Sequence, residues 1–389
     1  MLNSKIENEK LYLIPEGRID TNNAPQFQKE ADALINEHPG LIVVIDADDL
    51  SYISSAGLRV VLSLMKKGLK VSIINANSTV YEIFEATGFT EMMEVKKAYK
   101  KMSIEGLEPI GRGSNGIVYR VDEETIVKVY LNPDSLPDIQ NERRLARYTF
   151  VHGIPTAISY DIVRVNNTYG SVFELLNSST LSMLINEDPD NYKKYVHEFV
   201  SLLKTIHSKT SEPGDVPSIK ETYLNYALFL KDYLPQDSYN KLIGMIEAVP
   251  EDNHLVHGDY YTNNVMMQGD DPILIDLDTL SCGNPVFEFA STFNAYVGFN
   301  YVYEKTDDFV RITKYMCALI WDEFLEQYFE GESEEQLKLR NKRAAILGFT
   351  RILRRHIKRI GTDTEKTMAE YNKCRNRLIE LIDEVDSLI

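Results

Sequence analysis

Residues 257–278 constrain this chain more than any other stretch of its 389 residues. They place an aspartate, Asp259, five residues before an asparagine, Asn264, and a second aspartate, Asp276, at the end of an apolar strand. Moving a phosphoryl group from a metal-bound nucleotide to a hydroxyl needs a base that positions the acceptor and oxygen ligands that hold magnesium on the phosphates. We therefore expect Asp259 to be the base, and Asn264 and Asp276 to hold the metal. Asp and Asn also crowd ordinary turns, so the segment needs support from elsewhere.

A glycine-rich run upstream supplies part of that support. Its pattern is G-x-G-x-x-G-x-V, formed by Gly111, Gly113, Gly116 and Val118. In kinases a loop of this pattern covers the nucleotide phosphates, and a Cβ atom would obstruct the close approach of its backbone. Ser114 and Asn115 are further candidates for donating to a phosphate. An ordinary hairpin turn is the alternative for this run.

The β-rich segment that follows carries one lysine, Lys128, among apolar residues. Burying an unpaired ammonium is costly, so this lysine needs a partner. In kinases such a lysine contacts the nucleotide phosphates and pairs with a helix glutamate. Within the helical stretch 135–150, Glu142 is the first candidate for that partner and Asp138 is the second. An edge-strand lysine with its head in water is the alternative.

Taken in order, these features resemble the aminoglycoside phosphotransferase and choline kinase group of the protein-kinase-like fold, and more closely a bacterial phosphotransferase family of uncertain substrate. The resemblance covers residues 104–389 and is also carried by the runs at 153–156, 172–176, 256–259 and 274–281. It implies a two-lobed α+β domain, with a β-rich N-lobe over 104–176 and a helical C-lobe over 177–389. The implied cofactors are ATP (or GTP) and Mg²⁺.

The same resemblance implies roles for further residues. His257, grouped with the catalytic residues Asp259 and Lys128, would fix the catalytic loop by hydrogen bonds. Asp278 would support the metal site or bind a second ion, or it caps a turn. Residues 173–176 would form the hinge between the lobes, where the backbone at Glu174 and Leu176 meets adenine.

Two departures from protein kinases favour a small-molecule hydroxyl acceptor. The metal aspartate Asp276 lies in Ile-Asp-Leu-Asp rather than Asp-Phe-Gly, and no Ala-Pro-Glu follows. Position 261 is tyrosine, where Ser/Thr protein kinases usually have lysine. The sequence does not identify the acceptor, because the expected acceptor helices at 180–250 and 285–389 show no diagnostic motif.

Composition narrows the class of partner. The net charge of −17 argues against general binding to nucleic acid or to an anionic membrane, and it is compatible with a cationic substrate. Three cysteines without metal spacing fit a reducing compartment. The start has no apolar signal core, and no run approaches the roughly 18 apolar residues of a membrane span. We expect a bacterial cytoplasmic protein without nucleic-acid or membrane partners.

Residues 1–100 predict a small α/β sandwich that joins the kinase-like part through a short polar junction, 96–103. The expected strands are 11–15, 41–45 and 69–74, and the expected helices are 24–37, 55–67 and 80–86. Near its centre a strand ends in acidic residues and a loop delivers a serine, Ser55, to a helix N-terminus. Serine caps such an end well, and the end tolerates phosphate, so Ser55 is at least an N-cap candidate.

This pattern resembles the STAS domain of anti-sigma-factor antagonists over residues 5–98, with residues 78–89 as its third helix. The resemblance implies a protein partner and a regulatory phosphorylation at Ser55, whose added negative charge would repel that partner. The aspartate that often precedes the serine is Ser54 here.

A basic segment stands out in this acidic chain. Residues 338–359 hold nine Lys or Arg and no acid, with Arg351, Arg354, Arg355 and Lys358 on one helix face. The ordinary explanation is a solvated face that balances acidic neighbours. The alternatives are a dock for the acidic first domain or for an anionic substrate. Residues 363–389 predict one long amphipathic helix that closes the C-lobe.

Two functions of different classes follow. In the first, the chain is an enzyme, an ATP- and magnesium-dependent phosphotransferase with a regulatory STAS domain. In the second, it is a regulatory protein of the anti-sigma-factor-antagonist type, whose kinase-like part binds nucleotide or phosphorylates the STAS serine. The complete set Lys128, Glu142, Asp259, Asn264 and Asp276 favours the first.

Overall fold

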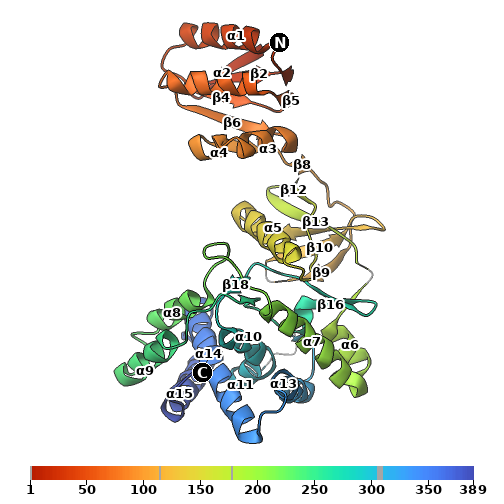
Figure 1. The fold of residues 1–389 in the computed structure, drawn as a ribbon, viewed down its shortest axis with the longest axis vertical. Coiled ribbons are helices and arrows are strands. Elements are labelled where there is room, and N and C mark those ends of the chain that lie inside the picture. Colours follow the sequence, from red (N-terminus) through yellow and green to blue (C-terminus); the bar gives the residue numbers. More distant parts are fainter. Residues whose placement is uncertain (1, 114, 177, 305–309) are drawn as a thin grey trace. The chain divides into compact units, whose positions relative to one another are not determined.

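The computed structural model describes residues 2–113, 115–176, 178–304 and 310–389. The chain divides into two compact units (Figure 1). The first comprises Met1–Gly106 and Ile162–Gly170, and the second comprises Leu107–Asp161 and Ser171–Ile389. No helix in the described part of the chain is long and apolar enough to cross a membrane.

The first unit is built around a sheet of order β1-β2-β4-β6-β7. β1 runs antiparallel to β2, whereas the pairs β2–β4, β4–β6 and β6–β7 are parallel, as is a separate pair, β3–β5. The strands are β1 (Leu2–Glu7), β2 (Lys10–Pro15), β3 (Gly17–Ile19), β4 (Ile42–Asp46), β5 (Leu50–Ile53), β6 (Val71–Ala76) and β7 (Val95–Lys97). The helices are α1 (Ala24–Glu37), α2 (Ser55–Lys66), α3 (Ser78–Ala86) and α4 (Phe89–Met92).

The strands and helices expected within residues 11–86 are present, each within two residues of its predicted bounds. The apolar strand β4 buries Val43, Val44 and Ile45, as a parallel strand inside a sheet should. The sequence does not predict β1. Five of its six residues are exposed, so its sequence carries no alternation of apolar and polar residues.

The strand-rich part that follows forms a sheet of order β8-β12-β13-β11-β10-β9. Its strands are β8 (Lys100–Lys101), β9 (Pro109–Arg112), β10 (Gly116–Arg120), β11 (Thr125–Tyr130), β12 (Asp161–Val165) and β13 (Thr168–Glu174). β8 lies within the predicted polar junction and pairs in parallel with β12. The helix α5 (Leu136–Val151) is shifted by one residue from its expected bounds.

The chain after β13 is mainly helical. Its helices are α6 (Leu181–Glu187), η1 (Pro189–Asn191), α7 (Tyr192–His207), α8 (Ile219–Phe229), α9 (Gln236–Glu247), η2 (Thr262–Asn264), η3 (Pro285–Phe287), α10 (Phe289–Phe293), η4 (Asn294–Gly298), α11 (Phe299–Val302), α13 (Lys314–Tyr328), α14 (Glu334–Arg359) and α15 (Glu365–Glu384). The short strands among them are β14 (Ser179–Thr180), β15 (Leu255–Val256), β16 (Val265–Gln268), β17 (Asp271–Leu274) and β18 (Ser281–Cys282). An α/β region, a β-rich part and a helical part thus follow one another as predicted.

The last helix is shorter than predicted. α15 ends at Glu384, and Val385 takes an extended conformation instead of continuing the helix. Val385 and Leu388 are buried, and Arg343 of α14 donates to the carbonyl oxygens of Ser387 and Ile389. The final residues therefore contribute apolar side chains to the core without being helical, which an amphipathic helical pattern does not reveal.

A close approach fixes the position of α14 beside the segment 289–302. A Cβ atom on Gly348 would lie 2.6 Å from Oδ1 of Asn294 and 2.6 Å from a ring carbon of Phe293. Nδ2 of Asn294 donates to the carbonyl of Gly348 at 3.1 Å. The glycine allows α14 to come this close, and Arg351 follows three residues later on the same helix.

Candidate functional site

The glycine-rich run forms the β9–β10 turn. The amide of Gly113 donates to the carbonyl of Gly116 at 2.9 Å, and Val118 pairs with Gly111 on one side and with Lys128 on the other. A Cβ atom on Gly116 would lie 2.7 Å from a backbone oxygen of β11, whereas one on Gly113 would meet nothing closer than 4.0 Å. Ser114 lies outside the described residues, and the carbonyl of Asn115 accepts the amide of Leu131.

Lys128 lies at the centre of an ion-paired group. Its Nζ is 3.1 Å from Oε1 of Glu142 on α5 and 3.2 Å from Oδ1 of Asp276. The hydroxyl of Tyr130 also donates to Glu142, at 2.7 Å. Burial alone would lower the pKa of Lys128, but the charges of Asp276 and Glu142 raise it, so the ammonium stays charged. The structure thus pairs Lys128 with Glu142, while Asp138 is exposed.

The segment between β15 and η2 carries Asp259 and Asn264. Nδ2 of Asn264 donates to the carbonyl of Asp259 at 2.8 Å, so Oδ1 is the atom left for a cation. His257 is fully buried. Its Nδ1 accepts the amide of Asp259 and its Nε2 lies 3.2 Å from the carbonyl of Ile275. His257 therefore holds the backbone on both sides of the site and does not itself face a reacting atom.

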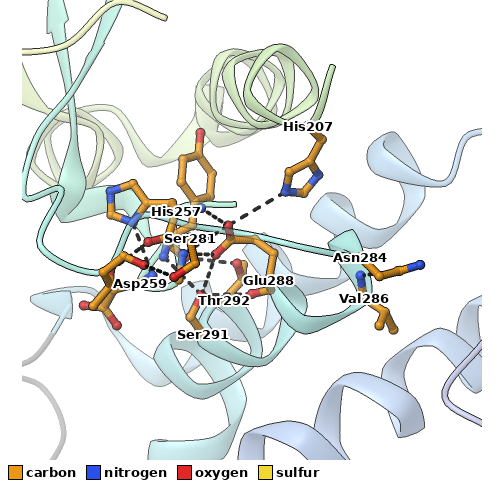
Figure 2. A network of polar contacts seen from close by, with 12 residues as sticks. His207, His257, Asp259, Ser281, Asn284, Val286, Glu288, Ser291 and Thr292 are labelled. Carbon is orange, nitrogen blue, oxygen red and sulfur yellow. Dashed lines mark hydrogen bonds and ion pairs between the residues drawn. The ribbon is translucent and has the colours of Figure 1, made fainter. Parts of the chain in front are cut away.

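A buried carboxylate, Glu288, binds the backbone of the same segment (Figure 2). It accepts the backbone amides of His257 and Gly258 and the hydroxyl of Ser291, and it lies 3.8 Å from Nε2 of His207 on α7. Burial alone would raise the pKa of Glu288, but the charges of His207 and His257 and the hydrogen bond from the amide of Gly258 lower it. Sequence reasoning missed Glu288, although a lone carboxylate in the apolar run 286–290 was a usable signal.

Arg351 of α14 was not linked to the site by the sequence, yet it pairs with the expected base. Its Nη2 is 2.8 Å from Oδ1 of Asp259, and its Nη1 donates to the carbonyl of Gly258 at 2.6 Å. Burial opposes the charge of Arg351, but Asp259 raises its pKa, so the guanidinium stays charged. The second carboxylate oxygen of Asp259, Oδ2, has no hydrogen-bond partner among the described residues.

The residues expected to hold a metal form an acidic edge of the site. Asp276 has a φ of 62°, a strained value for a residue other than glycine that is often found at functional sites. Partial burial, followed by the charges of Asp276 and Glu142, raises the pKa of Asp278 to about 7, although its side chain still reaches solvent. The carboxylate and amide oxygens of Asp276, Asp278 and Asn264 are the kind of ligand that suits Mg²⁺. Among the described residues, no group of three or more His, Cys, Asp or Glu could hold a metal, so any ion here would also need ligands from elsewhere.

The remaining expected residues lie as follows. Glu174 ends β13 and is exposed, and Leu176 follows it half-buried. In the first unit, Ser54 caps α2 by accepting the amide of Gly57, so Ser55 is not the N-cap. Ser55 is instead the exposed first residue of the helix, and its side chain makes no hydrogen bond to a described residue.

Comparison with known protein families identifies the second unit. Residues 106–341, more than half of the chain, match the model of the phosphotransferase enzyme family. The chain belongs to the phosphotransferase enzyme family. This membership confirms the predicted kinase-like fold, with its β-rich N-terminal part and its helical C-terminal part.

The first unit matches a different family. Residues 3–102 match the STAS domain model, which confirms the resemblance drawn from the sequence. The anti-sigma-B factor antagonists of Listeria monocytogenes and Listeria innocua are each 26% identical to this chain over 101 residues, covering 25% of this chain and 88% of those proteins.

Among solved structures, the ADP-bound aminoglycoside phosphotransferase APH(2'')-Ib is similar to this chain. The sequence identity is 12% and the TM-score is 0.47, with 77% of this chain and 98% of that chain covered. At this TM-score the likeness carries no argument about substrate, so the family assignment rests on the match over residues 106–341.

Proposed function

We propose that the second unit is an ATP- and magnesium-dependent phosphotransferase that moves the γ-phosphoryl group to a hydroxyl of a small molecule. The observation that carries this proposal is the convergence of Lys128, Glu142 and Asp276 in one ion-paired group. Asn264, hydrogen-bonded to the backbone of Asp259, completes the residue set that kinases use.

Each residue then has a definite task. Lys128, already held by Glu142, would contact the nucleotide phosphates. Asp259 would orient the acceptor hydroxyl through Oδ2 and take its proton as the acceptor oxygen bonds to the γ-phosphorus. The bond from that phosphorus to the bridging oxygen breaks, and ADP leaves. Magnesium would be held by Asn264, Asp276 and Asp278, and when bound it would neutralise negative charge on the phosphates.

The nucleotide would lie against the β9–β10 turn. Gly111, Gly113, Gly116 and Val118 would line its phosphates, together with Ser114 and Asn115. The backbone at Glu174 and Leu176 would contact the adenine, and GTP remains the alternative nucleotide. We also propose that residues 104–176 and 177–389 form the two lobes.

Replacing Asp259 tests the chemistry directly. Asp259→Asn should lower turnover by about 10²- to 10⁴-fold, the usual range for loss of a positioned base, while ATP binding stays within about twofold. The measurement is ADP release beside ATP binding by calorimetry. Asp270→Asn is the matched control, because Asp270 is exposed and makes no contact with the described site. Full turnover by Asp259→Asn would refute the assigned base.

A second candidate function rests on the exposure of Ser55. Here the kinase-like unit would phosphorylate the STAS serine, and the STAS domain, residues 1–100, would bind a protein partner in the bacterial cytoplasm. Intact mass after incubation with ATP and magnesium decides between the two functions. Ser78→Ala is a matched control for Ser55→Ala, because Ser78 is likewise an exposed first helical residue behind a separate cap.

A gain of one phosphoryl group that needs both Asp259 and Ser55 would establish self-phosphorylation. If mass is unchanged while slow ATP hydrolysis still depends on Asp259, the result points to a free small-molecule acceptor, to be sought by a metabolite screen. Phosphorylation that survives in Ser55→Ala but not in Ser78→Ala would contradict the assignment of the serine.

A further inference from the structure

The nine cations between residues 338 and 359 of α14 fall into two groups. Those of the first half each have a partner within the fold: Lys338 with Glu334, Arg340 with Glu332, Lys342 with Glu384, and Arg343 with the carbonyls of Ser387 and Ile389. For this half, the balancing of acidic neighbours is a sufficient explanation.

The cations of the second half are different. They are Arg351, Arg354, Arg355, Lys358 and Arg359. Arg351 is ion-paired with Asp259, whereas the other four form no ion pair with any residue that the structure describes. Positive charge that the fold does not neutralise therefore begins at the proposed base and continues along the helix.

Two of these cations are held by aromatic rings of α8. The guanidinium carbon of Arg354 lies 4.4 Å from the ring centre of Tyr226, and Nζ of Lys358 lies 5.0 Å from that of Phe229. Contacts of this kind hold a cation in place without cancelling its charge. A stacked guanidinium still has N–H donors at its edge, in a fork that matches phosphate and carboxylate.

The spacing along α14 sets a length scale. With a rise of 1.5 Å per residue, Arg354 lies about 4.5 Å and Lys358 about 10 Å along the axis from Arg351. Arg351 contacts Asp259 at 2.8 Å, so these spacings set the scale of an acceptor that would reach from the proposed base to either cation.

We propose that the acceptor is a hydroxyl compound with a phosphate or carboxylate group, bound by Arg354 and Lys358. This assignment rests on the proposed phosphotransferase function and specifies its acceptor. Arg351 is a positioning residue, which occupies Oδ1 of Asp259 and leaves Oδ2 for the hydroxyl. A cationic acceptor would meet this row of positive charge unfavourably.

The first test uses inorganic phosphate as the probe and the full chain saturated with AMP-PNP and Mg²⁺, which fills the nucleotide site. Thermal unfolding is followed against phosphate concentration for wild type, Arg354→Gln and Lys358→Gln. Lys338→Gln is the control, because Lys338 lies on the same helix and pairs with Glu334.

We expect phosphate to raise the unfolding temperature of the wild type. The Kd for phosphate should be at least tenfold higher in Arg354→Gln and in Lys358→Gln. Lys338→Gln should stay within twofold of wild type. Equal phosphate affinity in all four proteins, or no phosphate effect, would overturn the assignment. The proposed function itself fails if AMP-PNP with Mg²⁺ does not stabilise the protein, or if nucleotide binds but ADP release does not depend on Asp259, and both outcomes differ from a loss of phosphate binding alone.

The second test compares acceptors of one size but different charge. Glycerol 3-phosphate, glycerate, glycerol and the cationic 2-amino-1,3-propanediol are offered with ATP, and transfer is measured by mass. The proposal is supported if kcat/KM is higher for one anionic compound than for glycerol and if this preference is lost in Arg354→Gln. The identity of that compound, glycerol 3-phosphate or glycerate, then tells whether the bound group is a phosphate or a carboxylate. A higher kcat/KM for 2-amino-1,3-propanediol or for glycerol refutes the proposal. If none of the four compounds reacts, the phosphate titration of the first test decides whether the proposal stands.

Discussion

Glu288 offers the sharpest test of how the fold holds the catalytic segment. Its carboxylate accepts the amides of His257 and Gly258 and the hydroxyl of Ser291, all within the buried core. We consider two replacements, Glu288→Gln, which keeps the shape, and Glu288→Ala, which removes both acceptor oxygens. The first tests the charge and the second tests the hydrogen bonds as a whole.

The expected magnitudes follow from the contacts. A hydrogen bond to a charged group contributes about 1.5–3 kcal/mol and a neutral one about 0.5–1.5 kcal/mol. Glu288→Gln keeps one acceptor oxygen but places an amide N–H₂ group opposite the donors that the second oxygen accepted. We therefore expect it to lower the free energy of unfolding by about 2 kcal/mol. Glu288→Ala leaves two buried backbone amides unpaired at about 1–3 kcal/mol each, so it should cost about 4 kcal/mol.

The single tryptophan of the chain supplies a local assay. Trp321 is buried in α13 against Phe293 and Phe324, so its fluorescence in urea reports unfolding of the helical part alone. Glu247→Gln, at an exposed position, is the control. A surface substitution changes the free energy of unfolding by less than about 0.5 kcal/mol. If Glu288→Ala changes it no more than that, the prediction that Glu288 stabilises the catalytic segment is wrong.

The same residue predicts a pH dependence and a kinetic effect. The pKa of Glu288 is lowered from 4.5, so its charge stabilises the fold fully above about pH 4.5 and less as pH falls through the folded-state pKa. The stability difference between wild type and Glu288→Gln should therefore shrink below pH 4.5. A small displacement of Asp259 should also lower kcat by about 10- to 100-fold, with KM for ATP nearly unchanged.

Two further predictions concern the glycine-rich turn and the cysteines. Gly116→Ala should destabilise the nucleotide-free protein by more than 1 kcal/mol on the usual scale for backbone clashes, whereas Gly113→Ala should stay within about 0.5 kcal/mol. Equal thermal unfolding of the two variants would contradict the turn geometry. Cys317 and Cys374 are buried, and burial raises the pKa of Cys374, so a thiol reagent should modify only the half-buried Cys282 in the native protein and all three cysteines in urea. Rapid modification of all three in the native protein would refute this burial.

Two of the predicted contacts lie within short stretches of chain, whereas the predicted residues Lys128 and Asp276 meet across 148 residues. Asn264 contacts the backbone of Asp259 five residues away, and Lys128 meets Glu142 at a separation of 14 residues. Such contacts follow from a turn, a strand or one helix, whose geometry is set by local residue types. The start of α2 shows the limit, because Ser54 and Ser55 could each serve as the N-cap and the structure assigns that role to Ser54.

The sequence by itself determined the two families, most strands and helices of the first unit, and which residues could carry phosphoryl transfer, because these depend on periodicity and on motifs of fixed spacing. Only the tertiary structure decided what surrounds the base. Glu288 reaches His257 across 31 residues, and Arg351 reaches Asp259 across 92. These contacts depend on how close α14 can come at Gly348 and on how the helices pack, and no local pattern in the chain records such distances.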